Sequence, residues 1–376
     1  MQRVFLLLSA LLALYVSGFA CATTEPLAPD DEKPEPHIAL LLPLQSAVFG
    51  TAADTVRQGF EAAAILERQG LPVRIYGCSD ESTDIITLYH QAIGQGALAV
   101  VGPLTRSGTS ALATEQNFPV PTLALNTAED PSVDQLFFFG MAAEAEAKQV
   151  ARLVKQHGLH QVIILTTQAQ LSKRLQFAFE EEWNSLGGII LREVEFNDDP
   201  AVLADITDLP DTAIFLAADA GKARRIRPYL LNKLPIYATS QIFVGNSDSL
   251  TNYDLNGIRF VDMPWLLQDD HPAVMTYPRA NPPLSADRER LYALGIDAFR
   301  LIQLLLANQI NTALPLDGVS GDIQLHGHVF QRTALPAVLA QGFAQLTNTR
   351  AWRAQLPNTH ASPDVPILPA PTISEP

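Results

Sequence analysis

The chain has 376 residues, 47% of them hydrophobic, and a formal net charge of −15 from 25 basic and 40 acidic side chains. So negative a surface repels nucleic acid and anionic lipid headgroups, which excludes nucleic acid as an expected partner and suits a basic protein surface. Two cysteines, Cys21 and Cys78, are too few for a multi-cysteine zinc or iron–sulfur site.

Residues 1–20 have the pattern of a secretory signal peptide. Arg3 supplies a positive charge, Val4 to Val16 is a short apolar run, and small residues precede Cys21. A membrane-spanning helix needs roughly 20 apolar residues, and this run is shorter. We therefore expect export from the cytoplasm.

Two outcomes at Cys21 are open. Gly18-Phe19-Ala20-Cys21 resembles a bacterial lipobox, which predicts a lipid on the Cys21 sulfur, whereas Ala20-Cys21-Ala22 also fits ordinary cleavage. With the lipid, Ala22 predicts an anchor in the outer membrane, facing the periplasm. Without it, the protein is expected to be soluble in the periplasm. A lipidated Cys21 leaves Cys78 with no disulfide partner.

The chain after the signal divides by composition. Residues 21–36 are rich in Pro and acidic residues and predict an extended tether, and residues 356–376 are Pro-rich and predict a disordered tail. Between them, apolar runs alternate with helical patterns, as in a parallel sheet covered on both faces. The expected strands begin with 38–43, 73–77, 97–101, 122–126 and 136–139, and the pattern restarts with 161–167, 189–196, 212–217 and 236–239.

The restart predicts an α/β fold of two lobes, each a doubly wound and mostly parallel sheet. We expect a bilobed clamshell, with residues 37–140 and about 263–320 in lobe 1, and residues 141–262 and about 321–350 in lobe 2. The chain would cross between lobes near Gly140, Met263 and Ser320.

No catalytic motif is evident, because the chain lacks a P-loop, a G-x-S-x-G turn and an H-E-x-x-H helix. His326 and His328 can share one strand face but have no evident third metal ligand. Asp297, in an apolar helical context, fits a structural hydrogen-bonding acid better than a functional one. We expect a protein that is not an enzyme, with no metal and no cofactor.

Ligands of doubly wound sheets sit beyond the carboxyl ends of the strands, which places a candidate cleft between the lobes. Gly102 and Pro103 would shape a loop whose backbone N–H groups and Thr105 face this cleft. The alternative is that these are turn residues that close strands. The candidate cleft-lining residues are Gln45, Ser46, Gly102, Pro103, Thr105, Asn126 and Thr127 on one wall, and Thr166, Gln168, Asp219 and Ser240 on the other.

Several stretches resemble a known family. Ile38 to Leu44, with Gln58-Gly-Phe-Glu-Ala-Ala63, is similar to the opening of type I periplasmic-binding-protein folds. More narrowly, the chain resembles the C-terminal domain of the LpoA/LppC lipoproteins, which activate a penicillin-binding protein. The carrying stretches span about residues 37–335: Val100-Val-Gly-Pro-Leu104, Leu123 to Asn126, Trp183-x-x-Leu-Gly-Gly188, Arg290 to Phe299 and Gly318-x-Ser-Gly321.

The resemblance implies a lipoprotein of the outer membrane that binds a periplasmic docking domain of a class A penicillin-binding protein and activates it. Longer family members carry a helical-repeat domain before this region, and what it contributes is not carried over. The alternative function is a periplasmic solute-binding protein for an amino acid or similar small ligand, and a third is a scaffold. For an interface, we expect the long segments Asn246 to Gly257 and Leu266 to Asp287.

Overall fold

The computed structural model describes residues 34–67, 70–128, 133–230, 233–246 and 249–347. The expected signal peptide, most of the tether, Cys21 and the expected tail lie outside these residues. The described residues from Pro36 onwards cluster as one compact unit. Within the described ranges, no helix combines the length and the hydropathy needed to span a membrane.

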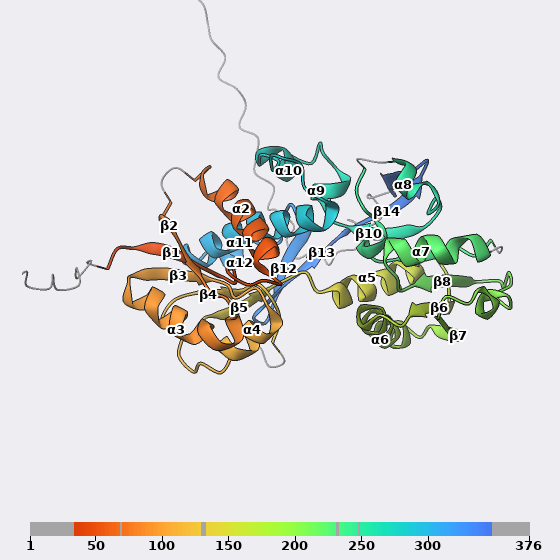
Figure 1. Ribbon diagram of the computed structural model, residues 1–376, viewed down its shortest axis with the longest axis horizontal. Coiled ribbons are helices and arrows are strands. Elements are labelled where there is room, and N and C mark those ends of the chain that lie inside the picture. The colour runs from red at the N-terminus through yellow and green to blue at the C-terminus, as the bar shows by residue number, and fades with distance from the viewer. Residues whose placement is uncertain (1–33, 68–69, 129–132, 231–232, 247–248, 348–376) are drawn as a thin grey trace, which may run out of the picture. The chain divides into compact units, whose positions relative to one another are not determined.

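The first sheet has eight strands in the order β11-β12-β13-β5-β4-β3-β1-β2 (Figure 1). Its parallel part follows from the short apolar runs of the sequence, and β1 is buried along its whole length. The first five strands are β1 (His37–Leu42), β2 (Val73–Gly77), β3 (Ala97–Val101), β4 (Thr122–Ala124) and β5 (Leu136–Phe139).

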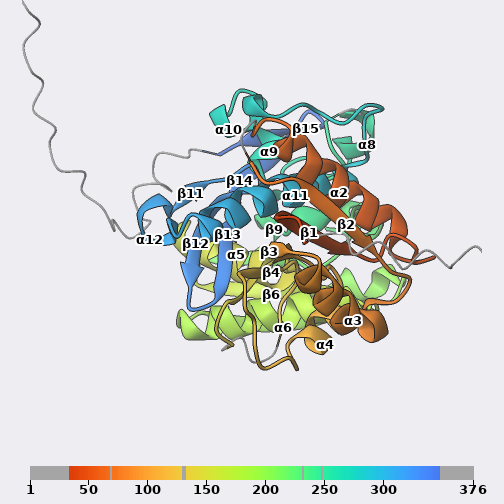
Figure 2. The same cartoon turned by 90° about the vertical axis from the view of Figure 1, so that its left-hand side faces the viewer.

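Helices cover both faces of this sheet, as Figure 2 shows. Alternate residues of β1 point into two different cores: Ile38 and Leu40 pack against α2 and α11, and Ala39 and Leu41 pack on the face of α3 and α4. The helices are α2 (Gly50–Ala64), α3 (Glu81–Gly94), α4 (Arg106–Leu112) and α11 (Ala286–Leu306).

Helices α2 and α11 cross in direct backbone contact. A Cβ atom on Gly295 would lie 2.1 Å from the carbonyl oxygen of Val56, and one on Gly59 would lie 1.9 Å from that of Tyr292. Glycine at both positions therefore permits the close crossing that holds the late helix α11 on the first sheet.

The second sheet repeats the same strand order. Its parallel part runs β7-β6-β8-β9-β10, which matches the β2-β1-β3-β4-β5 of the first sheet, and β14 and β15 extend it antiparallel. The strands are β6 (Gln161–Thr167), β7 (Ile189–Phe196), β8 (Thr212–Leu216), β9 (Ile236–Ala238), β10 (Arg259–Asp262), β14 (Leu335–Ala340) and β15 (Phe343–Leu346).

Two long helices, α5 (Ala143–Gln156) and α6 (Gln170–Ser185), pack on one face of the second sheet around Phe179, Trp183 and Phe215. The other face is covered by α7 (Ala220–Ile226) and loops. The short helices are η1 (Pro200–Leu203), η2 (Arg227–Tyr229), η3 (Ser240–Ile242), α8 (Ser249–Tyr253), α9 (Pro264–Leu267), α10 (Pro272–Thr276) and α12 (Ile310–Ala313). Two doubly wound, mostly parallel sheets confirm the predicted fold class.

The late strands differ from the expected division into lobes. Strands β11 (Leu316–Asp317), β12 (Asp322–His326) and β13 (Val329–Thr333) belong to the first sheet, not the second, because β13 pairs parallel with β5. The third crossing therefore lies at Ala334 rather than near Ser320, and residues 335–346 alone join the second sheet. Earlier in the chain, the change from the first sheet to the second falls between β5 and β6.

Candidate functional site

The carboxyl ends of β1, β3 and β4 meet at one edge of the first sheet. The loop after β3 contacts the end of β4 through a hydrogen bond from the Leu125 N–H to the Pro103 carbonyl, at 2.8 Å, and Asn126 Nδ2 donates to the Leu104 carbonyl at 3.0 Å. Gly102 has φ +111°, and a Cβ there would lie 2.0 Å from the Leu41 carbonyl oxygen, so glycine is required. Pro103 and Asn126, two residues of the predicted first wall, therefore lie close together at this edge.

The β3 loop does not offer its N–H groups to a cleft, and that expectation was wrong. Leu104 N and Thr105 N donate to the two carboxylate oxygens of Glu81, at 2.9 and 2.7 Å, and Thr105 Oγ1 accepts from Gly108 N at 3.1 Å. Burial raises the pKa of Glu81, and these hydrogen bonds oppose that shift. The amino end of α4 thus already has an internal carboxylate.

Two predicted residues, Thr105 and Asn126, line a mostly apolar pocket of about 420 Å³ at this edge. Its size is within the range of small-molecule sites. Gln45, by contrast, is exposed, and Ser46 Oγ accepts from Phe49 N at 3.3 Å within its own turn. The apolar lining consists of Phe49, Ala52, Leu104, Leu125, Met141, Leu291 and Leu294.

None of the four residues expected on the second wall lines this pocket. Thr166 is buried against β7, and its Oγ1 donates to the Val194 carbonyl at 3.4 Å. Asp219 caps α7 by accepting from Lys222 N at 2.9 Å, and Gln168 is exposed. Thr166, within β6, and Asp219, at the start of α7, therefore make local hydrogen bonds.

The fourth residue, Ser240, is part of a buried polar network where the chain crosses between the sheets. Ser240 Oγ donates to Glu146 Oε2 at 2.6 Å, and Arg332 Nη2 contacts Glu146 Oε1 at 2.6 Å. Arg290 donates to the Ser240 carbonyl at 3.0 Å and pairs with Asp262 at 2.6 Å. A continuous chain of charged contacts therefore connects α5, β10, α11 and β13.

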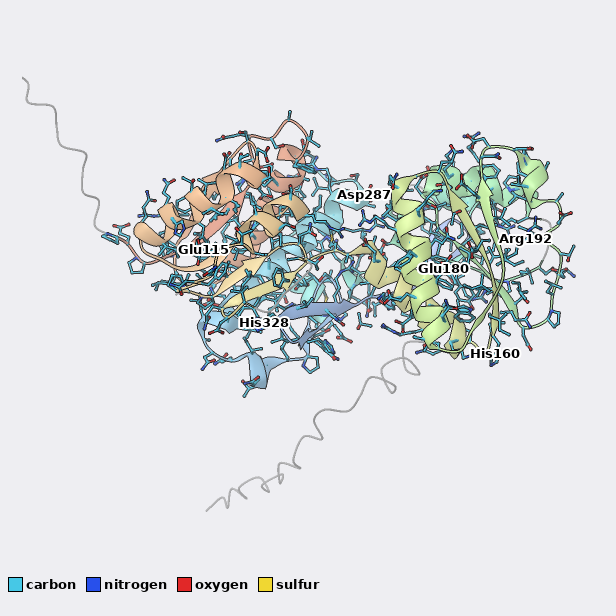
Figure 3. All side chains as sticks on the ribbon, turned by 90° about the horizontal axis from the view of Figure 1, so that it is seen from below. Glu115, His160, Glu180, Arg192, Asp287 and His328 are labelled. Carbon is cyan, nitrogen blue, oxygen red and sulfur yellow. The ribbon has the colours of Figure 1, made fainter. Side chains whose placement is uncertain are left out.

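This network is almost fully screened from solvent. The paired side chains are 1–7% exposed, and the cost of burying them is offset because each charge has a partner of opposite sign. Burial raises the pKa of the Asp262 carboxyl, which the neighbouring Arg290 opposes. At the start of α11, exposed Asp287 (Figure 3) accepts a further bond from Arg290 at 2.7 Å. The pairs Arg290–Asp262 and Arg332–Glu146 have no local signal in the sequence, since they join residues far apart in the chain.

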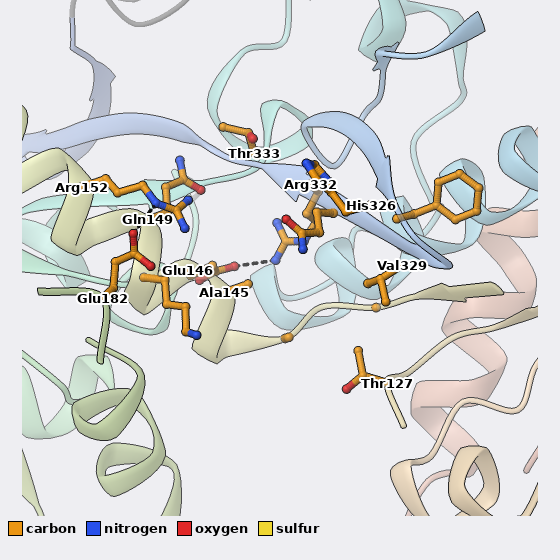
Figure 4. Close-up of a pocket in the computed structure, with 15 residues that line it drawn as sticks. Thr127, Ala145, Glu146, Gln149, Arg152, Glu182, His326, Val329, Arg332 and Thr333 are labelled. Carbon is orange, nitrogen blue, oxygen red and sulfur yellow. Dashed lines mark hydrogen bonds and ion pairs between the residues drawn. The ribbon is translucent and has the colours of Figure 1, made fainter. Parts of the chain in front are cut away.

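A polar pocket of about 440 Å³ lies beside the network, between α5 and the β12–β13 hairpin (Figure 4). Arg152 and Glu182 form an ion pair at 2.8 Å on its wall, and Gln149 makes two hydrogen bonds with the backbone of Ala334 at the third crossing. Thr127, expected on the cleft wall, lines this pocket instead of the apolar one.

The acid Asp297 holds the turn before β12. Its carboxylate accepts from Val319 N at 3.1 Å and from Ser320 N at 2.7 Å, and Arg300 contacts it at 3.1 Å. His328, considered as a metal ligand, instead has Nδ1 2.9 Å from the Leu136 carbonyl. No cluster of three or more metal-ligating side chains occurs among the described residues.

Two segments of the sequence, residues 31–211 and 210–332, match the family model described as "LppC putative lipoprotein". The chain belongs to the LppC family. Its curated relatives include penicillin-binding protein activator LpoA of Haemophilus influenzae, 28% identical over 75% of this chain and 49% of the relative, and of Aliivibrio fischeri, 25% identical over 80% and 55%. The chain thus spans about half the length of the curated LppC-family relatives it matches.

Solved structures share the fold of this LppC-family chain. A "putative branched-chain amino acid ABC transporter" from Chromobacterium violaceum is 36% identical, with a TM-score of 0.68 over 81% of this chain and all of that one. The C-domain of H. influenzae LpoA, described as a regulator of PBP1A, is 24% identical, with a TM-score of 0.69 over 83% of this chain and all of that one. Two LppC-like stretches of the sequence, Arg290 to Phe299 and Gly318 to Gly321, meet through Asp297.

Proposed function

We propose that this chain is a non-enzymatic lipoprotein that binds and activates a class A penicillin-binding protein. The observation that carries the proposal is the LppC match across residues 31–332, together with curated relatives named as activators of such proteins. The partner region would be a periplasmic docking domain of the synthase. Because an activator shifts a conformational equilibrium, it must bind the active state more tightly than the inactive one.

Localisation is part of the same proposal. The signal-like amino terminus and Cys21 support an outer-membrane anchor that faces the periplasm. Metabolic labelling with a palmitate analogue tests the anchor. Label on the wild type and none on a Cys21→Ser variant supports it, and an unlabelled wild type makes the protein a soluble periplasmic one.

The direct test is a synthase assay. We expect the purified protein to bind the cognate synthase and to raise its rate of glycan polymerisation or peptide crosslinking. Absence of both binding and rate change contradicts the proposal. A pull-down from membranes identifies the partner without prior choice, and recovery of a transporter instead of a synthase also contradicts it.

We place the synthase-binding interface at α8, because large apolar side chains are exposed on this helix. Leu250 and Tyr253 are 81% and 59% exposed, although large apolar side chains are mostly buried. We expect Leu250→Asp to weaken synthase binding. Phe177→Asp is the matched control, because Phe177 is 72% exposed on α6. Equal binding by both variants and the wild type contradicts this location.

Solute binding is the second candidate, favoured by the apolar pocket of about 420 Å³ and by the C. violaceum neighbour. Against an amino-acid ligand, Glu81 already occupies the N–H groups at the amino end of α4. A thermal-shift screen of amino acids separates the two functions. Stabilisation that increases with ligand concentration as mass action requires supports solute binding.

A further inference from the structure

A separate pocket of about 360 Å³ opens at the amino end of the second sheet, away from the strand ends considered above. It is lined by His157, Leu159, Pro235, Tyr237 and Arg259. His157 follows the last turn of α5, and Arg259 is the first residue of β10. Neither the apolar nor the polar pocket shares any of these residues.

Arg259 has no carboxylate partner among the described residues, although the chain has 40 acidic and 25 basic side chains. Its guanidinium carbon lies 5.7 Å from the centre of the Tyr237 ring, a cation–π arrangement that leaves the N–H donors available. Most other arginines with side-chain contacts, such as Arg152 and Arg174, pair with an acid.

His157 adds a second donor. Its Nδ1 lies 2.6 Å from the Tyr237 hydroxyl. Burial raises the pKa of Tyr237, so the hydroxyl keeps its proton and can donate to a His157 Nδ1 that carries none. Burial and the charge of Arg259 lower the pKa of His157, which favours the neutral ring. In that tautomer the ring proton is on Nε2, which is then a donor.

No carboxylate offers an acceptor in the described lining of this pocket. The backbone carbonyls of Leu153, Val154 and Lys155 at the end of α5 already accept bonds from residues 157–159. The lining contains no acidic residue, and its other members, Leu159 and Pro235, are apolar. A site that holds a guanidinium and no carboxylate favours an acceptor of negative charge, and the guanidinium fork matches a carboxylate.

We propose that Arg259 and His157 bind a free carboxylate that carries a small apolar group, such as the carboxyl terminus of a peptide ending in alanine. The Arg259 guanidinium and His157 Nε2–H would donate to the carboxylate, and Leu159 and Pro235 would contact the apolar group. This site is independent of the proposed synthase activation, and its test requires no synthase.

The test is NMR of the protein labelled with ¹⁵N-histidine, with the His157 signal assigned by its loss in His157→Gln. Before ligand is added, we expect the Nε2–H tautomer. N-acetylalanine should shift the His157 signal and raise its pKa by about one unit, since a carboxylate nearby favours the charged ring. The neutral probe N-acetylalanine amide should do neither.

The matched variants are Arg259→Gln and Arg192→Gln. We expect Arg259→Gln to weaken N-acetylalanine binding about tenfold, and to raise the His157 pKa in the absence of ligand, because the Arg259 charge is removed. Arg192, exposed on β7, is the control and should leave binding unchanged.

Three outcomes overturn the proposal. The first is an Nδ1–H tautomer in the free protein, and the second is an equal response to the amide probe. The third is a response to inorganic phosphate with none to N-acetylalanine, which would make the site one for phosphate rather than for a carboxylate.

Discussion

The buried ion pair between Arg332 and Glu146 gives the sharpest test of the network at the crossings. Arg332→Met removes the guanidinium 2.6 Å from Glu146 Oε1 and leaves a carboxylate that is 7% exposed. Breaking a buried pair costs about 3–5 kcal/mol. Ser240 still donates to Glu146 through N and Oγ, so we expect the lower end, about 3 kcal/mol of unfolding free energy.

Urea unfolding at pH 7 measures this loss, and the chain offers a matched control. Arg152 lies on α5, like Glu146, and pairs with Glu182 of α6. Because Arg152 is 50% exposed, we expect Arg152→Met to cost at most about 1 kcal/mol. Adding Glu146→Gln to Arg332→Met removes the stranded charge and should recover part of the stability. The reasoning is refuted if Arg332→Met costs no more than Arg152→Met, or if the double variant is no more stable than Arg332→Met.

Three further predictions concern stability and reactivity. Gly295→Ala should destabilise the protein by about 1–3 kcal/mol, because the new Cβ overpacks the helix crossing. Gly94→Ala is the control and should be neutral or stabilising, because no atom lies within 4 Å of its new Cβ. Thermal unfolding compares the two variants. The pKa of Glu81 is raised in the folded state, so the stability that this group contributes is fully present below the ordinary pKa of 4.5 and is lost as pH rises through the folded pKa. In urea unfolding, the stability of Glu81→Gln should therefore fall less steeply with pH above 4.5 than that of the wild type. An unchanged slope contradicts this prediction. Burial, with Glu81 and other nearby carboxylates, raises the pKa of Cys78 to about 11, so a disulfide reagent should label this thiol upon unfolding but not in the native protein. Fast labelling of native Cys78 contradicts the last prediction.

The sequence predicted the parallel cores well because a strand buried on both faces leaves an uninterrupted apolar run, as in residues 38–42 and 161–167. The sequence-based assignment placed two late strands, β12 and β13, in the wrong sheet. The pattern of residues 322–333 predicts strands but not their partner, which is chosen by the pairing of β13 with β5. Pairing across about 190 residues leaves no mark on local periodicity.

Site residues were harder to predict than strands for a similar reason. Thr105, which we predicted in the loop after a strand, lines a pocket. The backbone N–H of Thr105, however, donates to Glu81, which belongs to another helix, α3. The acidic pair Asp80-Glu81, shortly after the end of β2, is the signal that could have suggested a carboxylate at this edge. Ser240 likewise follows a strand, yet its hydroxyl is committed to Glu146.

The charges of the crossing network are divided between the two halves of the fold. Arg290 and Arg332 come from elements of the first sheet, and Glu146 and Asp262 come from elements of the second. A chimera that took one half from this chain and the other from a distant relative would inherit two buried charges of one sign. The donor of the other half must supply both counterions at matching positions, so the halves are complementary fragments and not interchangeable modules.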